Sequence, residues 1–325
     1  MNKTLTGLVD VHAHVGINLF NLFKGGVPTT QSLSDLAMKA QLNGIAHVVA
    51  FPMPTPFYFD PVTLADTNKR QSSGLEDFPY YLSNRNLLCE AALFGGNVIL
   101  PFMAIHPVDK VAAQIRFLEV VLEQRKAYGL KLHTLATGTA ATALIDSPFT
   151  DLMASNNIPI LIHSRLYPDL TGPNKVLKLA EKHSNVRVCI AHLADLSREV
   201  LCHILDFPNV YVDCAPFLTI CQFAREKSPH ISGDLLPLDY RDPVRCLVEL
   251  HALLPGRLVW GTDEPWTSQS DSETGELISH YTYRDECSLL TQLSQIGCHD
   301  VKYHIATHNT QRFLFGTPGG LSSPK

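Results

Sequence analysis

Short apolar runs rich in β-branched residues recur along the whole chain, separated by stretches whose apolar positions follow a helical period. Continuous apolar runs of this length are typical of strands that are buried on both faces of a parallel sheet. Eight of them occur in order, and eight strand–helix units predict an α/β fold, the closed (β/α)8 TIM barrel. The predicted strands are Leu8–His12, Ala46–Phe51, Val98–Ala104, Gly129–His133, Ile158–His163, Val186–His192, Val210–Cys214 and Leu258–Gly261.

Two connections between the predicted strands are unusually long. One follows strand 2, from Met53 to about Pro79, and the other follows strand 7, from Ala215 to about Pro243. Both leave the C-terminal ends of strands, the catalytic face of such barrels, and long loops in compact domains are commonly functional. We find no linker and expect one domain over residues 1–325. The predicted helices are Leu33–Asn43, Tyr81–Phe94, Val111–Tyr128, Lys175–His183, Glu199–Leu205, Val244–Leu253 and a closing one near Asn309–Phe315.

Composition fits a globular protein with a large core, because 45% of the 325 residues are hydrophobic and 18% are charged. The formal net charge of −5 is spread along the chain, which argues against a nucleic-acid partner. No apolar run approaches the ~18 residues of a membrane span, so we expect no membrane partner either. The N-terminal residues lack the apolar stretch of a signal peptide, and the eight cysteines form no CxxC pair. These features predict a cytoplasmic protein.

Polar residues close several of the predicted strands. His12 and His14 end strand 1 and share one face, since alternate side chains of a strand point the same way. Asp10 shares that face but lies deeper, where we expect a buried supporting role. The other strand-end residues are Lys131 and His133 on strand 4, His163 on strand 5, His192 on strand 6 and Asp263 after strand 8.

This set of side chains has the chemistry of a metal site. Neutral imidazoles and a carboxylate suit Zn²⁺, Mn²⁺ or Fe²⁺, and three or four protein ligands leave a position open for water. A bound divalent ion lowers the pKa of that water toward ~7. Asp263 could bind the metal with one oxygen and take the proton with the other. The sequence therefore predicts a metal-dependent enzyme.

The ordered set resembles the amidohydrolase superfamily, with HxH on strand 1, lysine on strand 4, histidines on strands 5 and 6, and aspartate on strand 8. Within it, the chain looks most like the branch of aminocarboxymuconate-semialdehyde decarboxylase, related aromatic decarboxylases and pyrone-dicarboxylate lactonase. The segments that carry this resemblance are Gly129–His133, Gly261–Pro265 and Asn309–Gly316. The DNase-like branch usually carries a Gly-Glu-Ile-Gly-Leu-Asp stretch, which this sequence lacks.

The resemblance implies one metal, usually zinc, held by four ligands, with His192 beside it as a polarising or acid–base group. In the binuclear branches a carboxylated lysine, here Lys131, bridges two metals, and His192 becomes a ligand. We favour one ion, and two remain an alternative. The ligands that the mononuclear resemblance implies are His12, His14, His163 and Asp263.

Three residues could contact substrate. Arg165, two residues beyond His163, could pair with a substrate carboxylate, or could be a solvated loop residue. Lys131, if unmodified, would be a cation beside the metal, which an anionic substrate would explain. His133 faces the same side as Lys131 and could contact substrate or support the site.

Three functions compete. The first is a hydrolase that acts on a lactone, an amide or a related carbonyl compound, with Asp263 as base and His192 stabilising the oxyanion. The second is a non-oxidative decarboxylase of an aromatic or dienoic acid, which would use the same ligands. The third is a non-catalytic barrel that scaffolds partners. We expect a small-molecule substrate, with or without negative charge, and the helical outer surface leaves room for a homodimer.

Overall fold

The computed structural model describes residues 5–18, 29–95, 98–166, 168–228, 231, 234–270 and 277–316. The main sheet has the strand order β2-β1-β3-β4-β5-β6-β7-β8-β9, and β10 pairs with β11 separately. From β1 to β9 the neighbours pair in parallel, whereas β2 lies antiparallel on β1. The strands are β1 (Leu8–Asn18), β2 (Thr29–Gln31), β3 (Ile45–Pro52), β4 (Ile99–Ile105), β5 (Gly129–His133), β6 (Ile160–His163), β7 (Val188–Ile190), β8 (Val210–Asp213), β9 (Leu258–Val259), β10 (Ser268–Ser270) and β11 (Leu277–His280).

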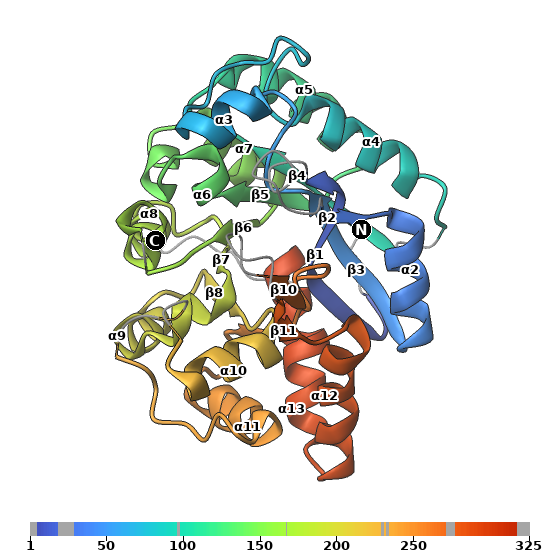
Figure 1. Ribbon diagram of the computed structural model, residues 1–325, viewed down its shortest axis with the longest axis vertical. Coiled ribbons are helices and arrows are strands. Elements are labelled where there is room, and N and C mark those ends of the chain that lie inside the picture. Colours follow the sequence, from blue (N-terminus) through green and yellow to red (C-terminus); the bar gives the residue numbers. More distant parts are fainter. Residues whose placement is uncertain are drawn as a thin grey trace, which may run out of the picture.

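The two ends of the parallel sheet meet and close a barrel. The N–H of Val11 donates to the carbonyl of Trp260 at 3.2 Å, and the N–H of His14 donates to the carbonyl of Glu264 at 2.7 Å. A parallel bridge joins Ala13 to Glu264. Figure 1 shows the resulting ring of strands with the helices outside it. This is the predicted TIM barrel, in which the C-terminal ends of the strands share one face.

Helices follow most of the strands, and two of them begin with the same sequence signal. Asp60 and Asp242 each precede a proline and accept a hydrogen bond from the backbone N–H three residues on. An aspartate cap followed by proline suits a helix start, because proline has no N–H to leave unsatisfied. The helices are α2 (Leu33–Leu42), α3 (Pro61–Thr67), α4 (Tyr81–Ala91), α5 (Val111–Glu123), α6 (Thr134–Thr137), α7 (Pro148–Asn156), α8 (Pro173–Lys182), α9 (Arg198–His203), α10 (Phe217–Glu226), α11 (Pro243–Leu253), α12 (Tyr283–Gln295), α13 (His299–Tyr303) and α14 (Asn309–Phe315).

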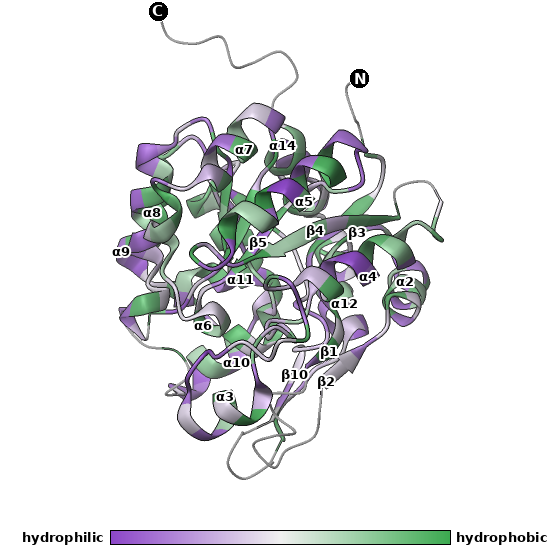
Figure 2. Ribbon diagram, turned by 90° about the horizontal axis from the view of Figure 1, so that it is seen from above, coloured by the Kyte–Doolittle hydropathy of each residue, from purple (hydrophilic) through white to green (hydrophobic). Residues whose placement is uncertain are grey.

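The core has two layers, divided by the sheet. Val48 packs in the larger layer between strands and helices, whereas its neighbour Val49 packs with Phe51 and Phe102 in the smaller layer. This alternation follows the two-residue period of a strand, with one side chain toward the helices and the next into the barrel. Figure 2 shows the hydrophobic strands inside and polar residues on the outer helices. The strands therefore read as continuous apolar runs.

The structure confirms the barrel and adds elements that the sequence pattern did not predict. Strand β2, the β10–β11 pair, and helices α3, α6, α7, α10, α12 and α13 were absent from the predicted set. The two long connections are partly helical, since α3 lies in the first and α10 in the second. Among the described residues, no helix has both the length and the apolar character that crossing a membrane requires.

Candidate metal centre

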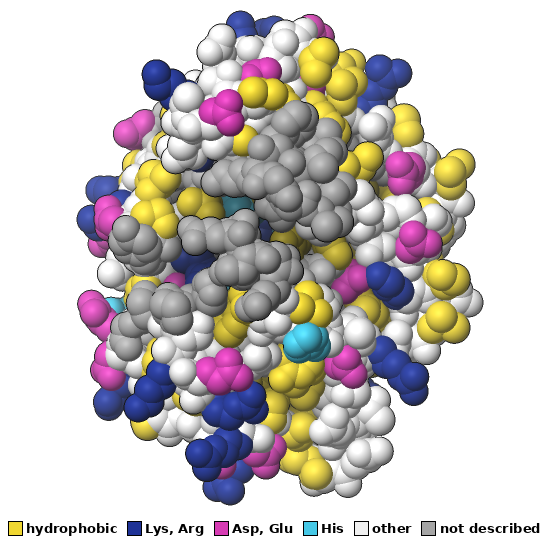
Figure 3. Space-filling view, viewed as in Figure 1, with side chains coloured by type: hydrophobic (Ala, Val, Ile, Leu, Met, Phe, Trp, Pro, Cys, Tyr) yellow, Lys and Arg dark blue, Asp and Glu magenta, His cyan; other side chains and the backbone are white. Residues whose placement is uncertain are grey.

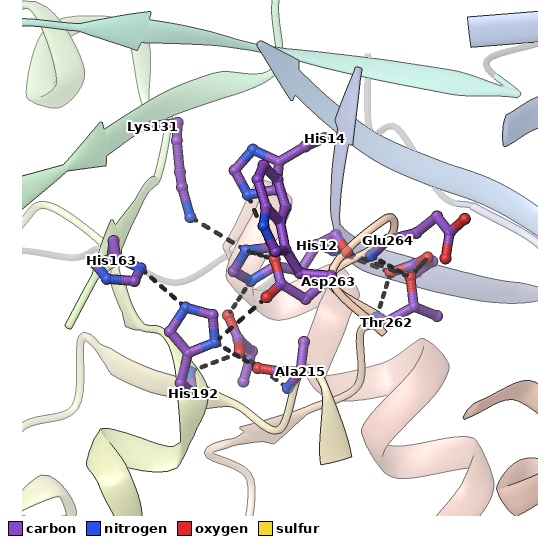
Figure 4. Close-up of polar contacts among 12 residues, drawn as sticks. His12, His14, Lys131, His163, His192, Ala215, Thr262, Asp263 and Glu264 are labelled. Atoms are coloured by element: carbon purple, nitrogen blue, oxygen red, sulfur yellow. Dashed lines mark hydrogen bonds and ion pairs between the residues drawn. The ribbon is translucent and has the colours of Figure 1, made fainter. Parts of the chain in front are cut away.

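The polar strand ends meet in one place on the catalytic face. His12 and His14 come from β1, Lys131 from β5 and His163 from β6, and Asp263 follows β9 (Figure 4). His12 is fully buried, and His14 and Asp263 are almost so. His192, in the turn after β7, also faces this group. Residues more than 200 positions apart thus share one small buried volume.

His12 is held between two carboxylates. Its Nδ1 lies 2.9 Å from Asp213 Oδ2, and its Nε2 lies 3.0 Å from Asp263 Oδ1. The neighbouring His12 ring lowers the pKa of Asp213 despite its burial, so Asp213 is an ionised acceptor. The Nδ1 of His12 must therefore carry the proton and donate it to Asp213. In the neutral ring, the lone pair of Nε2 then faces the carboxylate of Asp263.

His14 repeats this arrangement. Its Nδ1 donates to the carbonyl of Pro52 at 3.1 Å, and its Nε2 lies 3.4 Å from Asp263 Oδ1. Burial lowers the pKa of His14 to about 3, so the ring is neutral at pH 7 and Nε2 holds a lone pair. When the His12 ring is also neutral, both rings direct an acceptor nitrogen at the same oxygen of Asp263.

We call His12, His14 and Asp263 the strand-one cluster, and its electrostatics favour a proton or a metal ion between these three side chains. Burial and the Lys131 ammonium lower the pKa of His12, but Asp213 and Asp263 together raise it above its ordinary value. Against the effect of burial, His12 and His14 hold the pKa of Asp263 well below its usual range. A second proton on His12 or a metal ion would compensate the negative charge of Asp263. Two ligand atoms on one tetrahedral zinc lie about 3.3 Å apart, close to both contacts with Asp263 Oδ1.

His163 and His192, which we call the imidazole pair, lie beside this cluster. His163 Nδ1 is 3.0 Å from His192 Nε2, and His192 Nδ1 donates to the carbonyl of Ala215 at 2.5 Å. Burial lowers the pKa of His192 to about 4 and that of His163 well below its ordinary value, so both rings are neutral. His163 Nε2 is buried, and no described residue gives it a hydrogen-bond partner. His133 stacks on His163 with ring centroids 3.9 Å apart.

Within the described chain, the donor atoms of His12, His192 and Asp263 all lie within 4.8 Å of one another, a group that could hold a metal ion. His163 is not in this tightest group and contacts it through His192. The structure thus brings together all the residues that the sequence selected for metal binding, with His192 closer to His12 and Asp263 than His163 is.

Lys131 projects into the same buried volume. Its Nζ lies 3.3 Å from His12 Nε2 and 4.3 Å from the centre of the Phe51 ring. Burial lowers the pKa of this ammonium to about 8, although Asp213 and Asp263 raise it. Lys131 is 2% exposed and is not part of the wall of the open cavity described below.

A family model described as amidohydrolase matches residues 76–282, more than half of the chain. The chain belongs to the amidohydrolase family. Its barrel also resembles solved amidohydrolase structures at low identity. No curated protein sequence matches it.

Three solved structures illustrate this likeness of the amidohydrolase fold. The 5-carboxyvanillate decarboxylase of Sphingomonas paucimobilis has a TM-score of 0.61 at 10% identity, with 94% of this chain and 98% of that chain covered. An amidohydrolase of Burkholderia multivorans with bound zinc has a TM-score of 0.60 at 13% identity, covering 96% and 100%. An uncharacterised TIM-barrel protein of Bordetella bronchiseptica has a TM-score of 0.57 at 14% identity, covering 94% and 98%.

A cavity of about 200 Å³ opens over the metal centre of this amidohydrolase. Its wall includes His133 and Arg165, two of the three residues that we considered as substrate contacts. Figure 3 shows the face that carries this hollow, with hydrophobic and basic side chains around it. Other parts of the wall are formed by His163, Asp195, Ile220, Phe223 and Trp266.

Asp10 supports the site from below, as we expected. One oxygen accepts hydrogen bonds from the N–H groups of His12 and Thr262, each at 3.0 Å, and the other accepts from the Thr262 hydroxyl at 2.8 Å. Asp10 thereby ties β1 to the segment that carries Asp263. Glu264, the next residue, forms an ion pair with Lys39.

Sequence reasoning missed Asp213 and Asp195. Asp213 closes β8 just as His163 closes β6, so the strand-end signal was present and could have identified it. Asp195 follows His192 in a turn whose backbone path no local pattern indicated. Both carboxylates fix a residue of the site without lying in its strand-one cluster.

Proposed function

We propose that this amidohydrolase is a metal-dependent hydrolase that acts on a small carbonyl compound such as a lactone or an amide. The observation that carries the proposal is the convergence of the Nε2 atoms of His12 and His14 on one carboxylate oxygen of Asp263. Two imidazoles and a carboxylate are a normal donor set for a divalent metal. The zinc bound to the Burkholderia multivorans relative supports the same choice of ion.

The proposed ligands of a single Zn²⁺ are His12, His14, Asp263 and, completing the set, His163. His163 Nδ1 donates to His192 Nε2, so the Nε2 of the neutral His163 ring carries the lone pair that would bind the ion. His12 and His14 already have their Nδ1 protons held by Asp213 and a carbonyl. Such contacts fix the ring and its tautomer for metal binding.

When bound, the ion would supply Lewis-acid chemistry, lowering the pKa of water toward ~7 and polarising the substrate carbonyl. Asp263 offers a second oxygen that can accept a proton from the attacking water. His192 Nδ1 donates to Ala215 and its Nε2 accepts from His163 Nδ1, so a proton taken up beside the reacting group would be held at Nε2 in exchange for that hydrogen bond.

A two-metal site is the alternative that Lys131 favours. Because its pKa is about 8, part of the population is a neutral amine at mildly alkaline pH. A neutral amine adds to carbon dioxide, forming an N–C bond and releasing one proton, and the resulting carbamate could bridge two ions. The imidazole pair would then bind the second ion. Intact mass and metal content of the native protein distinguish the two arrangements.

A non-oxidative decarboxylase is the second candidate function. The guanidinium of Arg165, in the cavity wall, favours a substrate with a carboxylate group. The decarboxylase of Sphingomonas paucimobilis has the same fold. The metal ligands would be unchanged, and the metal would orient the carboxylate that is lost.

The test begins with zinc-loaded protein and a panel of lactones, amides and carboxylated aromatics. Hydrolysis predicts incorporation of ¹⁸O from labelled water into the product and no carbon dioxide, whereas decarboxylation predicts carbon dioxide without that label. Removal of the metal by a chelator should abolish turnover, and zinc should restore it. Turnover that persists at the same rate in metal-free protein would refute both proposals.

A further inference from the structure

A π-helix joins α13 to α14. It spans His304–His308, and the N–H of Asn309 donates to the carbonyl of His304, five residues back. Turns of this kind are rare, and they are frequently found at functional sites. A histidine lies at each end of this one, with His304 partly buried and His308 exposed. The centroids of the two rings are 5.5 Å apart, so both imidazoles lie on the same side of the π-helix.

The inner side of the π-helix contacts the barrel at the N-terminal ends of two strands. The hydroxyl of Thr307 donates to the carbonyl of Gly7 at 3.0 Å, just before β1. The side chain of Asn309 donates to the carbonyl of Leu258 at 2.9 Å, where β9 begins. The metal centre lies at the opposite ends of the strands. In TIM barrels the face on which the π-helix lies serves stability, whereas the other carries the active site.

A third histidine comes from α11, which packs beside α13 (Figure 1). The ring centroid of His251 lies 5.2 Å from that of His304, and we call His251, His304 and His308 the outer histidine cluster. Two imidazoles on one tetrahedral zinc have centroids about 5 Å apart, since each Zn–N bond is about 2.0–2.1 Å. The spacing of the three rings is therefore close to that of histidines that share an ion.

The nitrogens of the outer histidine cluster are suited to ligation. His304 Nδ1 is buried and has no hydrogen-bond partner among the described residues, which is a costly state for a polar atom. Burial and the nearby His304 lower the pKa of His251, although Asp300 raises it, so this ring is neutral at pH 7. Asp300 precedes His304 by four residues and adds a negative charge near the cluster. Neutral imidazoles suit zinc, nickel and copper ions.

The rings must turn before their nitrogens can meet at one ion. In the part of the chain that the structure describes, the group of three donors within 4.8 Å of one another is that of His12, His192 and Asp263. His308 is exposed and His251 is only partly buried, so rotation of these two rings requires no repacking of the barrel core. An ion would thus gather the outer histidine cluster around the partly buried His304.

We propose that the outer histidine cluster binds one divalent ion of the zinc, nickel and copper class. The bound ion joins α11 to the π-helix, and through the π-helix to the first residues of β1 and β9. Its role is structural, because the cluster lies on the face of the barrel that is opposite to the metal centre. The site is separate from that of the proposed function and does not depend on it.

The test is a calorimetric titration of zinc into metal-free, full-length protein. The proteins compared are wild type, H308Q, H251Q and D263N, with H203Q as the control, because His203 is an exposed histidine at the end of α9. Wild type and H203Q should bind one ion at the cluster besides those of the metal centre. H308Q and H251Q should bind that ion about 10-fold or more weakly, since the chelate loses a donor. D263N should lose the ion of the metal centre and keep this one.

Two further measurements locate the ion and test its role. Zinc-loaded crystals should show an anomalous peak about 2.0–2.1 Å from ring nitrogens of His304 and His308. Zinc should raise the midpoint of thermal unfolding of D263N but not of D263N/H308Q, since an ion that binds the folded chain stabilises it. Circular dichroism checks the fold of each variant.

Equal zinc stoichiometry and affinity in wild type, H308Q and H251Q would overturn the site, as would crystals without a peak at these rings. A peak at the outer histidine cluster without one at the metal centre would instead refute the proposed metal function and leave this site in place.

Discussion

The two sides of the metal centre are built in different ways. In the strand-one cluster, each imidazole has its second nitrogen fixed by an acceptor, Asp213 for His12 and the Pro52 carbonyl for His14. In the imidazole pair, His192 Nδ1 has such an anchor at the Ala215 carbonyl, whereas His163 Nδ1 is held only by the other member of the pair, His192 Nε2, among the described residues. One side is therefore ordered for metal binding before the ion arrives, and the other depends on contacts between its own members.

This difference indicates which side determines affinity. Ligands whose tautomer and orientation are already fixed lose little freedom when they bind an ion. We therefore infer that the strand-one cluster provides most of the metal affinity, while the imidazole pair completes the coordination and handles protons. Variants of the individual residues test this division of roles.

The largest effect is expected when the strand-one cluster is damaged. D263N or H12A should lose bound zinc and lower kcat/KM by on the order of 1000-fold or more, because the Lewis acid is lost. The control is H47Q, since His47 is a buried histidine on β3 that interacts through Nε2 with the carbonyl of Thr6. Zinc content by mass spectrometry and circular dichroism are measured on all three. Full zinc content and the full rate in both D263N and H12A would contradict the role of the strand-one cluster in metal binding.

The imidazole pair should separate into two roles. H163A should weaken zinc binding, whereas H192N should keep zinc and lower kcat by about 100-fold, the usual contribution of an acid–base group. Competition with a chromophoric chelator gives the affinity, and steady-state kinetics give kcat. Equal loss of zinc in both variants would instead assign His192 as a ligand.

The anchor of His12 should matter less than the ligand itself. D213N removes the charge that holds His12 Nδ1 and should weaken zinc binding by about 10- to 100-fold. D195N serves as the matched control, because that carboxylate binds Arg165 and Leu166 and not a ligand ring. If D213N leaves zinc affinity unchanged, the fixed tautomer is not what distinguishes the strand-one cluster.

The smallest effect is expected at a buried carboxyl group of α12. Glu286 of α12 is fully buried and accepts the N–H of Leu218 at 2.8 Å, at the start of α10 just beyond Ala215. Burial raises the pKa of Glu286 well above its ordinary value, so the folded chain keeps a proton that the unfolded chain loses. Its contribution to stability is complete below about pH 4.5 and declines as the pH rises toward the folded pKa.

E286Q removes this titration while it keeps the shape of the side chain. The free energy of unfolding of wild type relative to E286Q should fall between pH 5 and 7 by up to about 1.4 kcal/mol per pH unit. Urea unfolding of both proteins at several pH values measures the difference. A difference that stays constant with pH would show that Glu286 does not titrate in this way.

The sequence predicted the barrel well because its strands are buried on both faces and read as apolar runs. The strand-end residues followed, since parallel strands of a barrel must end on the same face. The sequence pattern did not predict α10, which lies in a segment where we expected a long loop. It also did not predict the left-handed turn at Asp195, because the path of that turn depends on contacts with β6 and Arg165. Asp213 was visible as a strand-end carboxylate, but its role depends on a contact with His12, 201 residues away.

The most direct test of the proposed metal site is anomalous diffraction from crystals of the zinc-loaded protein at the zinc absorption edge. We predict a peak about 2.0–2.2 Å from the Nε2 atoms of His12 and His14 and from an oxygen of Asp263. We also predict that this peak disappears in D263N crystals. Zinc bound elsewhere, with no peak between these three side chains, would contradict it.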